Sequence, residues 1–430
     1  MKKHSLFVCG TAALAVLLAL RSCAWLDDGA GFSRSRLETG PAAGGDRGNT
    51  GGSSTVKEGS LMVTAVEYPE GCFWQRDSSG GTGECHISLY CNGSRTVSVP
   101  SGAGFPASHD PDMHRCIDGK LYTDYSDAGR TYVCENGNLL FSYEGREMLC
   151  GFLIKDGDIY TLGQNRGGEG LSFRKNGTMV FSSGTGSVIG SAASSSSRTG
   201  ALYEDDGSIV FCFRSTSISQ GNALTSCYIV RDGKSEKLSF PETVSSVYDI
   251  RQIGGKVVAA VKHVTPAKSP ALIMDGEMKS LPLSISNIDI GSCLLRWDGS
   301  GNIALSTAFS GDGWKTIRRA IVRNNGSKVL FSDGETITDF WICGDDYAYP
   351  IVRDGVLTLF YTDGWVRKSI NPEGRYSLMS PACMMFDGNS VTAGLSPKDS
   401  AGFPLIIRGS RMEELQVNGY VTSVGYSGSD

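Results

Sequence analysis

Short apolar runs separated by Asn-Gly or Asp-Gly recur along the chain. Residues 271–283, ALIMDGEMKSLPL, read as one strand, a tight turn and a second strand, and RTYVCENGNLLFSY and SCYIVRDGKSEKLSF repeat this order. Alternating apolar and polar positions indicate a strand with one buried face. Asn-Gly or Asp-Gly between two such runs is a strong hairpin signal, because both central residues of the turn need positive φ. The pattern therefore predicts repeated antiparallel hairpins.

These turns form two interleaved series. The first series lies at Gly93, Gly137, Gly177, Gly233, Gly276, Gly326, Gly364 and, with Arg408 in place of Asn or Asp, Gly409. The second series lies at Gly71, Gly119, Gly157, Gly207, Gly255, Gly299, Gly344 and Gly388. Two tight turns with one longer connection between them make a unit of four short strands. Repeated in this way, the unit is the sequence form of a β-propeller blade.

The predicted fold class is all-β: a β-propeller of four-stranded antiparallel blades over residues 59–430. The paired turns favour eight blades, and seven is the alternative if the first and last units share one blade. The final run YVTSVGY follows Asn418-Gly419 and could close the ring. The resemblance is to propellers as an architecture and not to a specific family, because neither the WD dipeptide nor the kelch glycine pair recurs consistently.

The N-terminus predicts export. Two lysines precede an apolar run from Leu6 to Leu20, so the first 22 residues have the form of an export signal. The LRSC stretch resembles the lipobox of bacterial lipoproteins, which implies that Cys23 is the lipidated first residue of the mature chain. Arg21 departs from the small residue usual there, which leaves a periplasmic or secreted product as the alternative. Asp27 and Asp28 resemble the export signature of surface lipoproteins in the Bacteroidales.

Composition limits the partners. Residues 23–58 are rich in Gly and Ser and predict a flexible, lipid-anchored linker. The net charge of -5 provides no global basic field, so nucleic acid is not expected as a partner. The expected location is the outer membrane or cell surface, with membrane contact through the lipid anchor only.

Cysteines suggest two crosslinks. The sequence holds 13 cysteines, and export permits disulfides. Cys212 and Cys227 fall on neighbouring predicted strands, and Cys72 and Cys85 flank one loop, so both pairs are candidate disulfides. The alternative is that these residues are small apolar side chains buried between blades. No CxxC, P-loop or dinucleotide fingerprint occurs, and no metal or cofactor is predicted.

The candidate binding residues gather in one connection. The stretch SHDPDMHR places His109, Asp110, Asp112 and His114 within six residues. A polar turn around the proline explains this composition as well as a metal site would. In a four-stranded blade the connections between units and the middle loops open at the end opposite the tight turns, and connections vary freely. We therefore expect the recognition surface at that end, with Trp314 as an aromatic contact.

Two functions compete. The favoured one is a non-catalytic binding platform for a protein or glycan partner, because the chain combines a tether with loops of unequal length and lacks a G-x-S-x-G nucleophile motif. The alternative is an extracellular carbohydrate-active hydrolase or lyase, since the carboxylate pair of a glycosidase is placed by the fold and not by sequence spacing. Carboxylates and arginines crowding the channel mouth would favour the enzyme.

Overall fold

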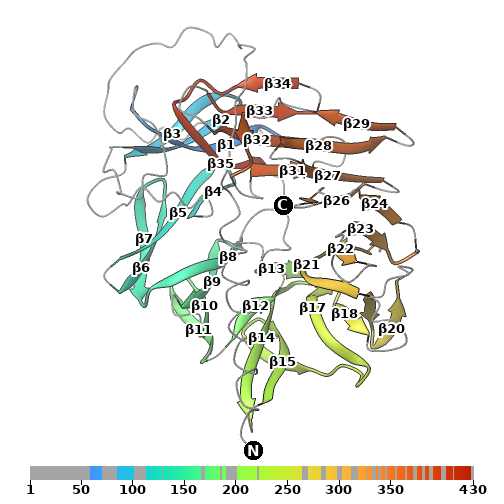
Figure 1. The fold of residues 1–430 in the computed structure, drawn as a ribbon. Coiled ribbons are helices and arrows are strands. Elements are labelled where there is room, and N and C mark those ends of the chain that lie inside the picture. Colours follow the sequence, from blue (N-terminus) through green and yellow to red (C-terminus); the bar gives the residue numbers. More distant parts are fainter. Residues whose placement is uncertain are drawn as a thin grey trace, which may run out of the picture.

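The computed structural model shows an all-β chain, and no α-helix occurs in the part of the chain that it describes (Figure 1). No helix found there is long and apolar enough to cross a membrane. The described residues are 59–69, 85–100, 113–127, 129–165, 170–184, 186–189, 201–219, 222–263, 270–281, 287–297, 303–310, 318–326, 328–331, 336–337, 340–343, 346–353, 356–363, 366–370, 375–379, 383–386, 391–398, 403–409 and 411–427.

The described strands form eight antiparallel sheets of four or five strands, numbered here in chain order. The first sheet holds β35 (Gly419–Tyr426), β1 (Leu61–Glu67), β2 (His86–Cys91) and β3 (Ser94–Pro100). The second holds β4 (His114–Ile117), β5 (Lys120–Asp127), β6 (Arg130–Glu135) and β7 (Asn138–Glu144). The third holds β8 (Glu147–Lys155), β9 (Asp158–Asn165), β10 (Leu171–Lys175) and β11 (Thr178–Ser183). The fourth holds β12 (Ser187–Ile189), β13 (Tyr203–Asp205), β14 (Ser208–Ser219), β15 (Asn222–Arg231) and β16 (Lys234–Leu238).

The remaining four sheets follow the same plan. The fifth holds β17 (Val244–Ile253), β18 (Lys256–His263), β19 (Pro270–Met274) and β20 (Glu277–Ser280). The sixth holds β21 (Asn287–Trp297), β22 (Ile303–Ser310), β23 (Arg318–Arg323) and β24 (Lys328–Phe331). The seventh holds β25 (Thr336–Ile337), β26 (Trp341–Cys343), β27 (Asp346–Arg353), β28 (Val356–Asp363) and β29 (Val366–Ile370). The eighth holds β30 (Tyr376–Ser377), β31 (Met384–Phe386), β32 (Val391–Pro397), β33 (Leu405–Arg408) and β34 (Arg411–Glu414).

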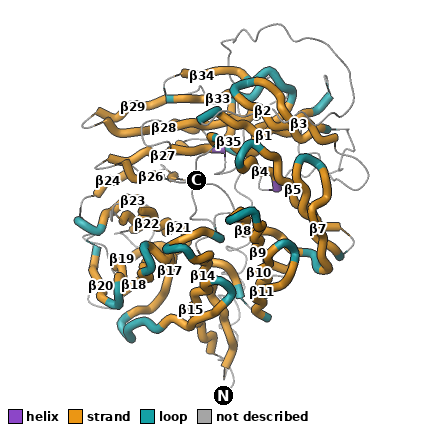
Figure 2. Tube along the Cα trace, turned by 180° about the vertical axis from the view of Figure 1, so that it is seen from behind, coloured by secondary structure: helices purple, strands orange, loops and turns teal. Residues whose placement is uncertain are grey.

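The predicted tight turns are present through the first five sheets and lie at the ends of the strands (Figure 2). In each of them a first turn residue with positive φ is followed by a glycine with positive φ. The first turn residues are Asn92, Asp118, Asn136, Asp156, Asn176, Asp206, Asp232, Gly254 and Asp275. The hairpin interpretation of Asn-Gly and Asp-Gly is confirmed at these positions. Gly71, predicted as a turn of the first unit, lies outside the described residues.

The first residue of an outer turn also bonds a strand beyond its own hairpin. The amide of Asn136 donates to the carbonyl of Leu121 at 2.7 Å, and the amide of Leu121 donates to Asn136 Oδ1 at 2.9 Å. The same two bonds join Asn92 to Leu61, Asn176 to Ile159 and Asp232 to Ile209. We call this pair of bonds the turn clip. It explains the choice of Asn or Asp, because a glycine in this place has no side-chain acceptor.

The first sheet is assembled from two distant parts of the chain. β35 pairs antiparallel with β1 from Leu61 opposite Tyr426 to Glu67 opposite Gly419. Backbone bonds join Gly59 N to Ser427 O and Ser427 N to Ser60 O, each at 2.9 Å. β35 therefore takes the place that a chain-adjacent strand takes in the second sheet. The sequence predicted that this run was available for such pairing.

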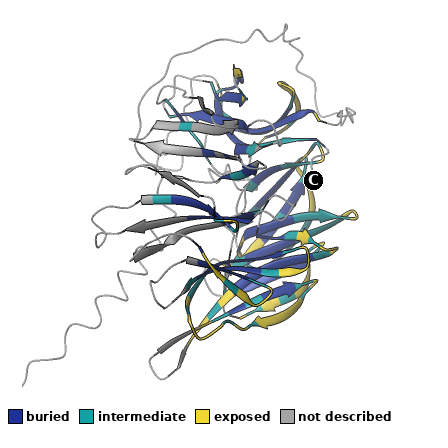
Figure 3. Cartoon of the chain, turned by 90° about the vertical axis from the view of Figure 1, so that its right-hand side faces the viewer, coloured by how far each residue is buried: buried dark blue, intermediate teal, exposed yellow. Residues whose placement is uncertain are grey.

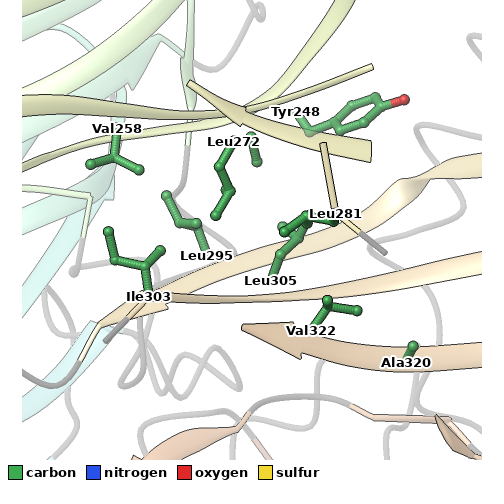
Figure 4. Close-up of a cluster of buried hydrophobic side chains, with 10 residues drawn as sticks. Tyr248, Val258, Leu272, Leu281, Leu295, Ile303, Leu305, Ala320 and Val322 are labelled. Carbon is green, nitrogen blue, oxygen red and sulfur yellow. The ribbon is translucent and has the colours of Figure 1, made fainter. Parts of the chain in front are cut away.

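Each sheet packs on the next one along the chain. Leu121 of the second sheet packs against Ile87 and Leu89 of the first. Figure 4 shows Leu295 of the sixth sheet facing Leu272 of the fifth, and Leu305 of the sixth beside Leu281, which follows β20. Comparable apolar clusters join the second sheet to the third, the third to the fourth, the fourth to the fifth, the seventh to the eighth, and the eighth back to the first. Between the sixth and seventh sheets, Arg323 Nε donates to the Tyr347 hydroxyl at 3.0 Å.

Burial follows the position of a strand within its sheet. β1 is almost wholly buried, whereas the first three residues of β7 and of β11 are exposed. Figure 3 shows buried and exposed stretches within the same sheets. In the fourth, seventh and eighth sheets two short strands share one neighbour where the repeat predicts a single strand. The four-strand unit is thus kept, with a broken first strand in these three sheets.

Candidate functional site

A cavity of about 550 Å³ opens between the second and third sheets at their tight-turn end. It is lined at the turns by Asp118, Gly157 and Asn176, which join β4 to β5, β8 to β9 and β10 to β11. Its volume lies within the range typical of small-molecule and side-chain binding pockets. This cavity is the candidate functional site.

One part of the cavity wall is apolar. Leu140 and Phe141 of β7 contribute from the second sheet, and Ile154 and Ile159 contribute from the third. Phe141 also contacts the third sheet, because a Cβ placed on Gly177 would meet its ring at 3.0 Å. A side chain larger than glycine at this turn would push Phe141 aside, so the close approach of the two sheets here depends on Gly177.

The polar part of the wall is a fixed set of three side chains. Glu135 accepts the hydroxyl of Tyr122 at 2.9 Å and forms a salt bridge with Lys120 at 3.0 Å. Burial, followed by the Glu135 carboxylate, raises the pKa of Tyr122, so this phenol stays protonated and donates. The side chain of Tyr122 is buried while Lys120 is exposed. These groups satisfy one another and have little capacity left for a ligand.

A second set of paired groups borders the cavity at Asn176. Its Oδ1 accepts the amide of Ile159 in the turn clip, and its Nδ2 donates to Asp158 Oδ1 at 2.7 Å. Lys175 pairs with Asp158 at 2.6 Å. The hydrogen bonds from Lys175 and Asn176 lower the pKa of Asp158, so its carboxylate is ionised at neutral pH. Asp118 and Asp156, both exposed, form no salt bridge with any residue that the structure describes.

Buried ion pairs stiffen the two sheets behind the cavity. Arg115 pairs with Asp124, and its guanidinium lies 4.5 Å from the centre of the Phe152 ring in the third sheet. Arg174 pairs with Glu147 at 3.0 Å and lies 4.0 Å from the centre of the Tyr143 ring in the second. Each arginine thus neutralises a carboxylate of its own sheet and contacts an aromatic ring of the neighbouring one.

The predicted binding residues lie elsewhere. His114 is the first residue of β4 and its side chain is only 3% exposed. His114 pairs with Thr123 in the middle of β5 and is not among the residues that line the cavity. His109, Asp110, Asp112 and Trp314 lie outside the described residues, as does Cys23. Within the described part of the chain, no three His, Cys, Asp or Glu side chains gather so as to hold a metal ion.

The predicted disulfide between Cys212 and Cys227 is not formed in the structure, and both thiols are free. The register places Cys212 opposite Ile229 and Cys227 opposite Arg214. The two cysteines are therefore diagonal neighbours, about 7–8 Å apart at Cα, which is too far for a disulfide without backbone movement. Burial raises the pKa of Cys212 to about 12. Cys85 is buried, and its predicted partner Cys72 lies outside the described residues.

Sequence reasoning placed function at the variable loops and passed over the residues that line the cavity. The signal was nevertheless present: the outer turn of the second sheet is followed by Leu139 and Leu140, where the first sheet has Arg95 and Thr96. Two consecutive apolar residues on an outer strand break the alternation that keeps one face polar.

Comparison with known proteins gives likeness in fold only. No protein-family model matches the chain, and no curated protein matches it. Among solved structures, acylaminoacyl peptidase from Pyrococcus horikoshii is 14% identical with a TM-score of 0.39, over 83% of this chain and 51% of that one. A eukaryotic initiation factor is 10% identical with a TM-score of 0.45, over 86% and 98%. TolB from Acinetobacter baumannii is 11% identical with a TM-score of 0.31, over 80% and 79%. The chain spans about half the length of the peptidase, and likenesses this weak carry no argument about function.

Proposed function

We propose that this protein is an exported, lipid-anchored propeller of eight blades that serves as a non-catalytic binding platform for a protein or glycan. The succession of eight described sheets, each packed on the next, supports the blade count. The pairing of β35 with β1 supports ring closure. The export signal, the lipobox-like Cys23 and the linker of residues 23–58 support an anchor at the outer membrane or cell surface.

The observation that carries the binding function is the cavity between the second and third sheets. It combines an apolar wall with the polar set of Lys120, Tyr122 and Glu135, which already satisfy one another. A wall of this kind favours recognition by shape and apolar contact, since such pockets are lined mostly by apolar side chains with a few placed polar groups. Buried Asp124 and Glu147 are each held by an arginine, which suits a structural role for these carboxylates.

The loop end of the ring remains a second proposed surface, formed by His109, Asp110, Asp112, His114 and Trp314. It would act beside the cavity and not in place of it, because His114 is not among the residues that line the cavity. A platform with two faces can hold one partner at the turns and present the other face to a second partner.

The test is a comparison of binding with turnover. Residues 59–430 would be applied to an array of bacterial and plant polysaccharides and to an array of short peptides, and bound protein and newly released reducing ends would be measured together. We expect saturable binding to at least one array without release of reducing ends. Release of reducing ends would establish the carbohydrate-active enzyme instead.

Two variants then distinguish the loop surface from the cavity as the binding site. Replacing His109, Asp112 and Trp314 by alanine removes the loop-end groups, and Leu140→Asp places a charge in the cavity wall. The variant that loses binding while keeping its melting temperature identifies the surface. If neither variant changes binding, both proposed surfaces are wrong.

A further inference from the structure

Large apolar side chains are exposed on few described strands. Six such residues are exposed, and four of them lie on the outer strands of the second and third sheets. These four are Leu139, Leu140, Met179 and Val180, with exposed fractions of 57%, 42%, 43% and 43%. Leu140 also lines the cavity. The apolar surface formed by Leu139 and Leu140 is therefore continuous with the cavity wall.

A β-bulge turns both leucines outward. In the second sheet Cys134 lies opposite Leu139 and Val133 lies opposite Phe141, so Leu140 is the additional residue of the bulge. Bulges redirect side chains at the edges of sheets. The third sheet has the same bulge at Val180, and the first has it at Thr96. The backbone is thus repeated in three sheets, and only the side chains differ.

In the first sheet this position is polar. Thr96 donates its hydroxyl to the carbonyl of Leu89 at 3.1 Å, and the neighbouring Arg95 pairs with Glu67 at 3.3 Å. Leu139 and Leu140 replace both of these polar contacts in the second sheet. The bulge consequently needs no apolar residue for its own geometry, and the two leucines are not explained by folding alone.

Charge along the outer strands shows the same contrast. Outer strands are edges, and charged residues protect exposed edges from unwanted pairing. Six of the eight described outer strands carry a charged residue within their first three positions: β3, β16, β20, β24, β29 and β34. β7 and β11 carry none there. The two unprotected edges are neighbours, and the cavity opens between their sheets.

From these observations we infer that the cavity and the Leu139–Leu140 ridge bind an extended segment of a partner protein that presents an apolar side chain next to a lysine or arginine. This inference rests on the proposed platform function and names the class of partner. The apolar side chain enters the cavity against Leu140, Phe141 and Ile159. The adjacent basic group meets Asp118, whose carboxylate has no salt-bridge partner among the described residues, whereas Lys120 is already neutralised by Glu135.

The lining disfavours the other ligand classes. A sugar offers many hydroxyl groups, but Glu135 and Asn176 already use their hydrogen-bonding atoms within the wall. The exposed carboxylates of Asp118 and Asp156 repel an anionic lipid surface. An apolar anchor with a neighbouring positive charge satisfies both the aliphatic wall and the acidic turn.

The experiment measures binding of fluorescent short peptides to the protein carrying Leu139→Arg with Leu140→Thr. This variant reproduces Arg95 and Thr96 on the same bulge, so the fold is retained. Peptides with a central leucine or phenylalanine flanked by arginine are compared with glutamate-flanked versions. We expect the arginine-flanked peptides to bind the natural protein and to lose about tenfold or more in affinity with the double variant. Asp118→Asn should weaken the same peptides about threefold and should not weaken the glutamate-flanked peptides.

A matched control variant, Arg95→Leu with Thr96→Leu, adds an apolar pair on the bulge of the first sheet while keeping Leu139 and Leu140, and should leave peptide affinity unchanged. Equal binding by natural protein and the Leu139→Arg, Leu140→Thr variant overturns the inference. Binding to phosphatidylglycerol vesicles that the same variant abolishes also overturns it, in favour of a lipid surface. If polysaccharide binding persists in that variant and no peptide binds, this inference fails while the platform function stands. If neither array binds the natural protein, both fail.

Discussion

The first and second sheets have the same strand order but are closed in different ways. The second is continuous in the chain, with β4 to β7 joined in succession. The first takes β35 from the far end of the sequence, and we call the pairing of β35 with β1 the seam. Hydroxyl groups form hydrogen bonds along the seam: Thr64 bonds Ser423, and Thr422 donates to the Thr64 carbonyl at 3.2 Å. The second instead contains the buried pair of Arg115 and Asp124. Local hairpins and distant pairing thus reach one geometry, but only the second sheet can form before the rest of the chain is in place.

The largest effect is expected at the seam. Deleting the chain from Arg411 onward removes β34 and β35, which leaves β1 and β33 as unpaired edges. Exposed edges promote aggregation. We expect the truncated protein to lose cooperative thermal unfolding and to aggregate, as measured by calorimetry and light scattering. A soluble truncation that melts in one transition would show that the first sheet does not depend on β35.

Within the second sheet the largest effect should come from the buried ion pair. Asp124→Asn keeps the shape of the side chain but leaves the charge of Arg115 without its carboxylate. Breaking a buried pair in this way costs about 3 kcal/mol or more of unfolding free energy. Thr64→Val is the matched change at the seam and should cost about 1 kcal/mol. Urea denaturation measures both, and equal losses would contradict the contrast between the two sheets.

The turn clip should contribute equally to both sheets. Asn136→Ala and Asn92→Ala each remove one acceptor from a strand amide, that of Leu121 or of Leu61. Each should lower the unfolding free energy by about 1 kcal/mol. Hydrogen exchange then distinguishes the sheets: we expect faster exchange of the Leu61 amide in Asn92→Ala, because β1 begins at the seam. Unchanged exchange there would show that β35 alone holds β1.

The smallest effect is expected outside both sheets. Deleting residues 29–58 removes none of the described strands. The free energy of unfolding, obtained from the midpoint of denaturation, should change by no more than about 0.5 kcal/mol. A larger loss would mean that this segment contacts the folded domain.

In a bacterial host Cys23→Ala should release the protein from the membrane fraction, and a variant that stays bound would exclude Cys23 as the anchor.

Sequence predicted the repeat well because its determinants are local. Positive φ at Asn136 and Gly137, for example, follows from two adjacent residues. The sequence also identified the run YVTSVGY, residues 420–426, as a strand available for pairing. It did not show that β35 would take the inner place of the first sheet, because β1 and β35 are brought together only by the packing of all the intervening sheets.

The site was harder to predict for a physical reason. A cavity between two sheets depends on how far apart they pack, and here Gly177 sets that separation through its contact with Phe141. The sequence marks Asn176-Gly177 as a turn, but nothing in it shows that Phe141 of the neighbouring sheet packs against this glycine. The disulfide between Cys212 and Cys227 failed as a prediction because neighbouring strands were identified without their register, and a displacement of two residues is enough to separate two thiols.

The seam brings the two ends of the folded domain next to each other, which allows the chain to be circularly permuted. The Ser427 amide already donates to the Ser60 carbonyl across it, and the Ser427 carbonyl accepts the amide of Gly59. A short glycine-containing connector from Ser427 to Gly59 would make the first sheet continuous, and new termini could then be opened at another exposed turn, such as Asp156-Gly157. Circular permutants built in this way should fold to the same set of sheets, so the sheet that carries the chain ends is a matter of connectivity and not of geometry.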